Sequence, residues 1–348
     1  MSELDIEAPG ALERYLAERG RVPAIDSGRL SLQVLRGGVS NRTVRVRLPT
    51  GEEWVVKQAL AKLRVSVDWY ADPARIHREA LGMEALRALV PPGAVVRLLF
   101  EDEENHLLVM EAVREPFENW KETLLAGRIA DELIDQFARI LAAIHAGGAR
   151  RRELLSRDFS DKSLFAELRV EPYYTYTASR LPEAADFLRT LAAEAMEASQ
   201  TLVHGDYSPK NILVHDGRLV LLDHEVIHLG DPAFDLGFSL THLLSKAHHL
   251  PDRRRDFVRG ARRYWNAYAQ AVADEPFAGE ELERRAVRHT LGCLLARAAG
   301  RSRLEYLDEG ERSRQAKAAI GLMARPPAEV GELVERFVDS IGEGDGND

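Results

Sequence analysis

Three polar residues in the second half of the chain have types and spacings that suit phosphate chemistry. Four residues separate Asp206 from Asn211 within the stretch VHGDYSPKNILV, and Asp223 directly follows the apolar run LVLL. The two apolar runs flank a His-Asp-Gly turn and predict a hairpin, so we expect the three side chains to converge. Carboxylate and carboxamide oxygens, here from Asn211 and Asp223, are the ligands that Mg²⁺ prefers. A metal-assisted reaction on a phosphate is therefore the chemistry that this pattern favours.

Phosphoryl transfer assigns a separate role to each residue of this set. Asp206 is placed to orient a hydroxyl and accept its proton, while metal and positioning supply most of the catalysis. Glu225 stands two residues after Asp223, and on an extended segment both would point to one side. We therefore expect Glu225 to support the metal, with a solvent-facing or loop-capping glutamate as the alternative. By itself His-Gly-Asp is explained equally well by an ordinary turn.

The first half must then supply elements that hold a nucleotide. Alternation of apolar and polar residues predicts strands through Leu32–Val34, Val44–Leu48 and Trp54–Val56, followed by a hairpin within 94–113. Helices are predicted at 9–19 and at 72–89, the latter with Ile76, Leu81, Ala85 and Leu89 as apolar marks. A five-stranded antiparallel sheet with one main helix is the expected result.

After Glu111 the pattern becomes mostly helical. Helices are predicted at 131–146 and 182–198, and only short hairpin strands surround the catalytic stretch. We place the joint at 111–114. This gives a sheet-rich N-lobe at 1–112, which would bind the nucleotide phosphates, and a helical C-lobe at 113–348, which would hold the catalytic loop, the metal site and the substrate.

The residues just quoted resemble those of the aminoglycoside phosphotransferase and choline kinase superfamily, small-molecule relatives of protein kinases. Asp206 and Asn211 match the catalytic-loop pattern, and Asp223 matches the metal-binding aspartate of the following hairpin. Asp235, in GDPAFDLG, matches the aspartate that buttresses the catalytic loop, with His204 as a second structural support. The likeness covers nearly the whole chain. It implies an α+β, two-lobed protein-kinase-like fold and ATP-dependent transfer of the γ-phosphate to an alcohol.

The same resemblance implies a nucleotide site in the first half. Lys57 would grip the phosphates from the third strand, and Glu79 would pair with it. The turn LRGGVSN would cover the phosphates with backbone N–H groups, and LLVMEAV would form a hinge against the adenine edge. The residues implied for these roles are Gly37, Gly38, Ser40, Asn41, Lys57, Glu79, Met110, Glu111 and Ala112. Taken singly, each is an ordinary surface, turn or strand residue; together and in this order they favour the site.

Two details are similar to methylthioribose kinase, namely the Asp-x-Glu at 223–225 and the layout of the C-terminal helices. Methylthioribose kinases carry adjacent arginines in this tail, whereas this chain has Ala296-Arg297, and they tend to have serine where this chain has Asn211. The substrate class therefore stays at a sugar, an aminoglycoside or an amino alcohol. Tyr173, Tyr174, Tyr176 and Arg297 are candidate substrate contacts, with ordinary packing of a tyrosine-containing loop as the alternative.

Composition bounds the remaining possibilities. The chain of 348 residues has a net charge of −9, which disfavours a general nucleic-acid partner. Cys293 is the only cysteine, and neither a signal peptide nor a membrane-spanning run is evident, so we expect a cytoplasmic protein. We expect ATP and Mg²⁺ as cofactors, a small hydroxylated substrate, no membrane partner, and a monomer or homodimer. The alternative function is a catalytically silent, kinase-like nucleotide-binding or scaffold protein.

Overall fold

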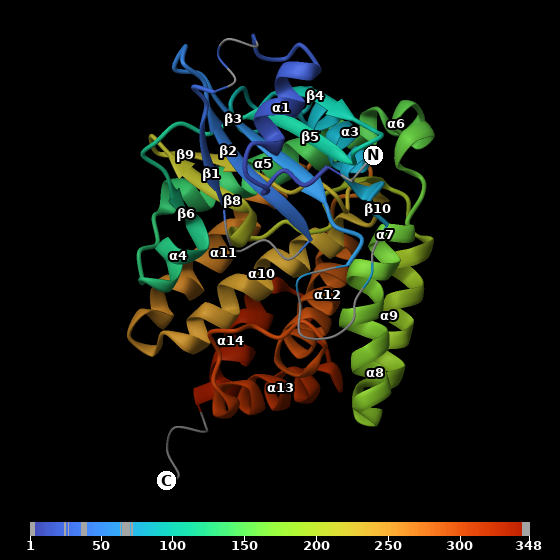
Figure 1. Ribbon diagram of the computed structural model, residues 1–348. Coiled ribbons are helices and arrows are strands. Elements are labelled where there is room, and N and C mark those ends of the chain that lie inside the picture. Colours follow the sequence, from blue (N-terminus) through green and yellow to red (C-terminus); the bar gives the residue numbers. More distant parts are fainter. Residues whose placement is uncertain are drawn as a thin grey trace. The chain divides into compact units, whose positions relative to one another are not determined.

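The computed structural model describes residues 4–23, 26, 28–35, 40–62, 64, 70 and 72–342. The chain groups into two compact units (Figure 1). Unit 1 consists of Met1–Ala88 with Val95–Phe117, and unit 2 of Leu89–Ala94 with Glu118–Asp348. The α+β, kinase-like fold expected from the sequence is confirmed, because an antiparallel sheet dominates unit 1 and helices dominate unit 2.

Unit 1 is built on a five-stranded antiparallel sheet with the strand order β1-β2-β3-β5-β4. Its elements are α1 (Ala11–Glu18), β1 (Ser31–Val34), β2 (Asn41–Arg47), β3 (Glu53–Ala59), α3 (Arg75–Arg87), β4 (Leu98–Asp102) and β5 (Leu107–Glu111). Val44, Val46 and Val56 are almost completely buried in one core cluster with α1 residues such as Leu12 and Leu16. Arg45 and Lys57, which alternate with these valines along the strands, are buried as well. The pairing of Val44 with Val56 fixes the register of β2 and β3 and so the direction in which Lys57 points.

The buried stripe of α3 differs from the predicted one. Leu81 is exposed, whereas Glu79 and Met83 are buried together with Ile76 and Leu86. The prediction selected apolar residues only, but the face that packs on the sheet carries Glu79 as well. A buried carboxylate is tolerated at that position because a cation from the sheet meets it.

Unit 2 is mostly helical. Its helices are α4 (Trp120–Leu125), α5 (Asp131–Arg150), α6 (Arg152–Phe159), α7 (Ser163–Phe165), the π-helical η1 (Ala166–Thr175), α8 (Tyr176–Arg180), η2 (Pro182–Ala184), α9 (Ala185–Glu197), η3 (Pro209–Asn211), α10 (Pro232–His249), η4 (Pro251–Arg253), α11 (Arg254–Ala271), α12 (Glu280–Ala299), α13 (Glu309–Met323) and α14 (Val330–Gly342). The central helix α10 packs closely on α12, where a Cβ on Gly237 would lie 2.5 Å from the Cβ of His289. Only glycine permits that approach.

Short strands carry the loops of interest in unit 2. They are β6 (Glu118–Asn119), β7 (Thr201–Val203), β8 (Ile212–His215), β9 (Arg218–Leu221) and β10 (His228–Gly230). β7 pairs with β10, and β6, β8 and β9 form a second small sheet. Asp216 and Gly217, which turn the β8–β9 hairpin, both have positive φ, as a tight two-residue turn requires.

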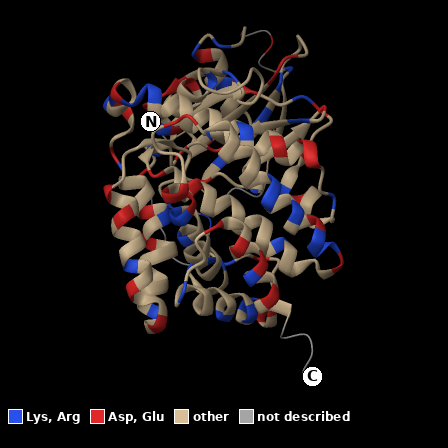
Figure 2. Ribbon diagram, turned by 180° about the vertical axis from the view of Figure 1, so that it is seen from behind, with Lys and Arg blue, Asp and Glu red and all other residues tan. Residues whose placement is uncertain are grey.

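Charged residues of both signs are interspersed along the ribbon (Figure 2). Among the helices of the described chain, we find none that combines the length and the apolar character needed to cross a membrane.

Candidate active site

Asp206 lies in the loop between β7 and η3 and is held by two donors on one oxygen. Asn211 Nδ2 donates to Asp206 Oδ2 at 2.7 Å, and Arg169 Nη2 lies 2.9 Å from the same oxygen. Asn211 also donates to the Asp206 carbonyl at 3.0 Å. Among the described residues, Asp206 Oδ1 has no hydrogen-bond donor. One oxygen is thus fixed by the protein, and the other has no such contact within the described residues.

The backbone of this loop is tied to α10 by Asp235. The Asp235 carboxylate accepts hydrogen bonds from the N–H groups of His204, at 2.7 Å, and Gly205, at 2.9 Å. His145 Nε2 lies 3.3 Å from the same carboxylate. Burial by itself raises the pKa of Asp235, but the hydrogen bond and charge of His145 and the contacts with His204 outweigh it and lower the pKa. The ionised carboxylate therefore stabilises the fold at neutral pH, and this contribution is lost as the pH falls through the folded-state pKa.

His204 is buried beside a second histidine. Its Nε2 lies 3.1 Å from Nδ1 of His224, and its Nδ1 accepts the N–H of Asp206 at 3.2 Å. Burial lowers the pKa of His204 despite the nearby carboxylates of Asp235 and Asp206. The neutral ring of His204 therefore supports the loop through its contacts with His224 and with the backbone N–H of Asp206.

Gly205 is required by both its conformation and its surroundings. Its φ is +78°, and an added Cβ would lie 2.8 Å from Val226 Cγ1 and 2.9 Å from the Val226 carbonyl oxygen. Gly217 has a similar φ of +69° but no atom within 4 Å of the corresponding position. A side chain at either position would strain the backbone, but only at Gly205 would it also clash with neighbouring atoms. Comparing substitutions of the two glycines therefore distinguishes these two effects.

We expect Gly205→Ala to lower the melting temperature and to reduce kcat strongly, because the loop must move away from Val226 and so displace Asp206. The loss of stability should be about 1–3 kcal/mol. Gly217→Ala is the matched control, since it imposes the same backbone strain in open space. Chemical denaturation and steady-state kinetics of both variants test this. Equal losses of activity in the two variants would contradict the steric role of Gly205.

Asn211 and Asp223 are brought together by the hairpin. The Leu222 N–H donates to the Asn211 carbonyl at 2.8 Å, which places Asp223 next to Asn211 along the backbone. The amide nitrogen of Asn211 is used by Asp206, and within the described chain its Oδ1 has no donor. Asn211 therefore presents a carbonyl oxygen, and Asp223 is half-buried beside it.

The reason given for the role of Glu225 is wrong in one respect. Residues 222–225 are not an extended segment, because Asp223 has a left-handed φ of +66°. His224 is buried under the loop against His204. Asp and Asn tolerate left-handed backbone better than most residues. Glu225 is 9% exposed, and its charge and that of Asp223 both raise the pKa of Arg169. The support of a metal by Glu225 stays a prediction.

The donor set fits a hard cation. Asn211 and Asp223 offer oxygen ligands, with Glu225 near them, and no group of three or more His, Cys, Asp or Glu side chains is arranged around one point in the described residues. A Mg²⁺ ion held here would need further oxygens from phosphate or water, which is how Mg²⁺ usually binds.

Arg169 was not foreseen from the sequence. It lies on η1, donates through Nε to the Gly205 carbonyl at 2.8 Å, and pairs with Asp206. Burial by itself lowers the pKa of Arg169, but Asp206 and the other acidic groups around it raise the pKa overall. An arginine about forty residues before the loop carries no motif, so only the fold reveals this contact.

The segment with Tyr173, Tyr174 and Tyr176 is helical. The alternative considered above, ordinary packing of a loop, was therefore wrong about the loop. Tyr174 is fully buried, and its hydroxyl lies 2.8 Å from His289 Nδ1, so it is a core residue. Tyr173 is 3% exposed in η1, and Tyr176 is half-buried at the start of α8.

Arg297, on α12, lies over the ring of Tyr173 at 5.0 Å from the centroid. Tyr176 carries Arg301 over its own ring at 4.9 Å. The rings of Tyr173 and Tyr176, on which a cationic substrate could have stacked, are thus each next to an arginine of this chain.

In unit 1, Lys57 and Glu79 form a buried ion pair. Lys57 Nζ lies 2.6 Å and 2.8 Å from the two carboxylate oxygens, with Lys57 on β3 and Glu79 on α3. The structure thus brings together the two side chains that the sequence had paired. Such a pair is well placed to present a fixed ammonium group to an anion.

Ser40, at the described end of the turn that was expected to cover the phosphates, is tied to α3. Arg75, a second residue that the sequence did not indicate, is almost fully buried and donates to the carbonyls of Ser40 and Leu60. Asn41 begins β2 with a buried Oδ1 that has no partner among the residues described. Gly37 and Gly38 lie outside the described residues.

The hinge segment ends β5. The N–H of Glu111 donates to the Arg97 carbonyl and that of Ala112 to the Glu53 carbonyl, both at 2.9 Å. Met110 is 7% exposed within the sheet. A nucleotide base at this edge would therefore have to use backbone groups other than these two N–H groups.

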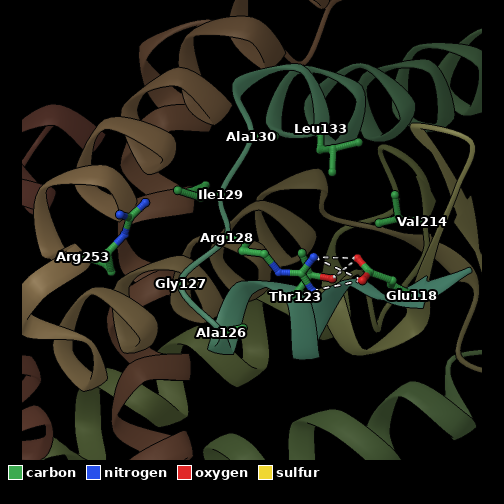
Figure 3. A pocket seen from close by; sticks show the side chains of 10 residues that line it. All are labelled: Glu118, Thr123, Ala126, Gly127, Arg128, Ile129, Ala130, Leu133, Val214 and Arg253. Atoms are coloured by element: carbon green, nitrogen blue, oxygen red, sulfur yellow. Dashed lines mark hydrogen bonds and ion pairs between the residues drawn. The ribbon is translucent and has the colours of Figure 1, made fainter.

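A pocket of about 500 Å³ in unit 2 contains none of these residues. Figure 3 shows the Glu118–Arg128 ion pair across it, with Leu133 and Val214 on another side and Arg253 near Gly127. Because Glu118 and Arg128 satisfy each other, this pocket presents little polar chemistry, and we place the active site at the Asp206 loop instead.

A family model described as the phosphotransferase enzyme family (APH) matches residues 31–277, most of the chain and all of the loops just described. The chain belongs to the phosphotransferase enzyme family. The resemblance drawn from the sequence motifs is thereby confirmed.

Curated relatives of this phosphotransferase are methylthioribose kinases. The Yersinia enterocolitica enzyme is 26% identical over 226 residues, covering 57% of this chain and 55% of the relative. The chain thus aligns with only about half of that enzyme. The Yersinia pseudotuberculosis enzyme is 25% identical over 351 residues, covering 82% of this chain and 84% of the relative.

Among solved structures, a choline/ethanolamine kinase family protein from Mesorhizobium loti superposes with a TM-score of 0.53. The two are 16% identical, and the match covers 96% of this phosphotransferase and 98% of that chain. At this identity, the likeness shows the fold alone.

Proposed function

We propose that this protein is an ATP-dependent small-molecule kinase that transfers the γ-phosphate to an alcohol group of its acceptor. The observation that carries the proposal is the state of Asp206. One carboxylate oxygen is fixed by Asn211 and Arg169, and the other has no donor in the described chain. A carboxylate held in this way can orient a hydroxyl and accept its proton as the oxygen attacks phosphorus.

The remaining residues prepare the site around that proton transfer. Asn211 and Asp223 would hold Mg²⁺, which, when bound, neutralises phosphate charge. Lys57, steadied by Glu79, would hold the phosphates of ATP from unit 1. Asp235 and Gly205 keep the loop in the shape that holds Asp206 beside Asn211 and Arg169. Met110, Glu111 and Ala112 remain the proposed contacts of the adenine, through backbone groups.

The acceptor is proposed as a small hydroxylated molecule. Supporting this are the methylthioribose kinase relatives, whose name indicates a sugar-like acceptor. The test is a screen for ATP-dependent phosphate transfer with sugars, thiosugars, amino alcohols and aminoglycosides, with product identified by mass. Transfer that depends on Asp206 supports the proposal. ATP binding without transfer to any acceptor would favour the catalytically silent alternative.

We expect Lys57→Ala to raise KM for ATP and to lower kcat, with a loss in kcat/KM of about 10- to 100-fold. Lys57 would meet phosphate directly, so its removal deletes a charged hydrogen bond. Glu79→Gln should have a smaller effect, because the amide still bonds to Lys57 without fixing its charge as firmly. Steady-state kinetics with varied ATP measure both.

The control for this pair is Glu101→Gln, an exposed carboxylate of unit 1 that lies 2.9 Å from His77 and forms no ion pair with Lys57. It should leave ATP kinetics unchanged. If both Lys57→Ala and Glu79→Gln behaved like this control, the proposal that unit 1 holds a nucleotide site would be contradicted.

A further inference from the structure

Two arginines and a histidine from three elements of unit 2 gather around the ring of Phe238, and one of the arginines pairs with Asp206. Arg297 on α12 and Arg169 on η1 both lie against the ring of Phe238, with guanidinium carbons 5.3 Å and 5.9 Å from its centroid. His242, one turn further along α10, packs edge-on against the same ring at 5.2 Å. Arg297 and Arg169 therefore lie against the same ring. Arg169 in turn forms an ion pair with Asp206, with 2.9 Å between Nη2 and Oδ2.

Arg297 has hydrogen-bonding capacity to spare. Its Nη1 donates to the carbonyl and the hydroxyl oxygen of Ser302, both at 2.9 Å. Its buried Nε has no partner, and no carboxylate of the described chain forms an ion pair with it. A half-buried guanidinium without an anion is uncommon, since burying a charge costs free energy unless it is paired.

A further buried cation lies on α10 beside this cluster, and no carboxylate of the described residues forms an ion pair with it. Lys246, fully buried on α10, has one weak contact, from Nζ to the His242 carbonyl at 3.4 Å, and lies 5.2 Å from the Tyr306 ring centre. His242 Nε2 is buried without a partner in the part of the chain that the structure describes. The buried hydroxyls of Ser245 and Tyr306 interact with each other. Lys246 and His242 thus remain without an anionic partner among the described residues.

The protonation behaviour of the cluster is consistent with a local excess of positive charge. Burial, then the charge of Lys121, lowers the pKa of Lys246 to about 7, with Arg297 acting in the same direction and Glu305 and Glu122 opposing. Burial lowers the pKa of His242 well below its usual value, and Arg297, Lys246, Lys210 and Lys121 add to that effect. An anion placed here would reverse these shifts.

We propose that the acceptor carries an oxyanion, such as a carboxylate or a phosphate, which binds to Arg297 while the hydroxyl to be phosphorylated faces Asp206. This inference rests on the proposed function and names the chemical class of its substrate. The guanidinium supplies two parallel donors that match an oxyanion, and the buried ammonium group of Lys246 on α10 adds to its field. The acceptor is thus a hydroxy acid, a sugar acid or a phosphorylated polyol.

A cationic acceptor fits this surface poorly. Stacking an ammonium group on Tyr173 or Tyr176 would place it beside Arg297 or Arg301, which already lie over those rings. Tyr174 is fully buried in the core. Like charges at such short separations disfavour binding. The cluster therefore discriminates against aminoglycosides and choline-like amines.

The test compares acceptors that differ only in charge. D-glucuronate, D-glucose and D-glucosamine form one set, and glycerate, glycerol and 3-amino-1,2-propanediol form another. ADP formation with Mg-ATP gives kcat/KM for each, with Asp206→Asn as the background. We expect the anionic member of a set to exceed the neutral member by about 10- to 100-fold, the value of one charged hydrogen-bonding contact.

Arg297→Gln should remove most of this preference. Arg301→Gln is the matched control, because Arg301 also lies over a tyrosine ring but pairs with Glu171 at 3.2 Å. It should leave the ratio between the anionic and neutral acceptors unchanged. Asp206-dependent turnover that favours neutral or cationic acceptors, or an Arg297→Gln enzyme with an unchanged ratio, would overturn the inference while leaving the kinase function intact.

A binding measurement decides the matter if no acceptor of either set is turned over. Sulfate is titrated by calorimetry into the full-length protein saturated with Mg²⁺ and the non-hydrolysable analogue AMP-PNP, so that phosphate-binding groups are already occupied. We expect sulfate to bind the wild type and the Arg301→Gln variant at least about 10-fold more tightly than Arg297→Gln. Equal binding to all three proteins would refute an anion site at Arg297. Failure of AMP-PNP itself to bind would instead count against the proposed function.

Lys246 is a positioning residue in this scheme, because it acts through the field at Arg297. Lys246→Met should retain or raise the melting temperature, since replacing a buried, unpaired ammonium by an apolar side chain removes a desolvation cost. It should nevertheless lower the preference for anionic acceptors by about 3- to 10-fold. A lower melting temperature with an unchanged preference would assign Lys246 a purely structural role and remove it from the site.

Discussion

Replacing Asp206 by asparagine should lower kcat by about 10²- to 10⁴-fold and leave ATP affinity nearly unchanged. The variant loses the base, and it also loses the local geometry. Asp206 Oδ2 accepts from Asn211 and from Arg169, so an amide must either oppose two donors with its NH₂ group or turn that group toward the acceptor hydroxyl. Neither orientation can take up a proton.

The measurement is kcat on the true acceptor together with calorimetric binding of AMP-PNP. Asp216→Asn is the matched control, because Asp216 is an exposed aspartate at the turn of the β8–β9 hairpin that follows the same loop. It should retain wild-type kinetics. A near-normal kcat in Asp206→Asn would show that another group accepts the proton.

Replacing Asp223 by asparagine should reduce the rate by about 10³-fold or more at every Mg²⁺ concentration, because a charged metal ligand contributes several kcal/mol. This substitution suits the backbone, since Asp223 has a φ of +66° and asparagine tolerates that conformation. A loss of activity can therefore be assigned to the missing charge and not to a distorted hairpin. Circular dichroism and melting temperature should match the wild type.

Glu225→Gln tests the neighbouring carboxylate by the same titration. If Glu225 supports the metal, directly or through water, the variant should need more Mg²⁺ for half-maximal rate and should partly recover at high Mg²⁺. Glu225 is nearly buried, and its charge raises the pKa of Arg169, which pairs with Asp206. An unchanged Mg²⁺ dependence would remove Glu225 from the metal site and leave Asn211 and Asp223.

Local sequence determined much of this protein. Period-2 alternation predicts the strands around Val44, Val46 and Val56, because one face of each strand must be buried. The Asp-x-x-x-x-Asn spacing predicts that Asn211 lies near Asp206, since the four intervening residues form a single short loop whose ends stay close. The pairing of Lys57 with Glu79 was anticipated as well, but only through a family resemblance, because the two residues are twenty-two positions apart on different elements.

Only the tertiary structure decided how the site is completed. Arg169 reaches Asp206 from a π-helical segment thirty-seven residues away, and no local pattern marks an arginine that will be buried against a carboxylate. Leu81 was expected to be buried and is exposed, because the face of α3 is set by the ion pair to Lys57 and not by apolar content alone. The left-handed backbone of Asp223 depends on how its loop packs against the rest of unit 2. Short-range periodicity encodes which residues form an element and which face is apolar. The partners of buried charges are chosen by contacts between residues distant in the chain, and these exist only once the elements have packed.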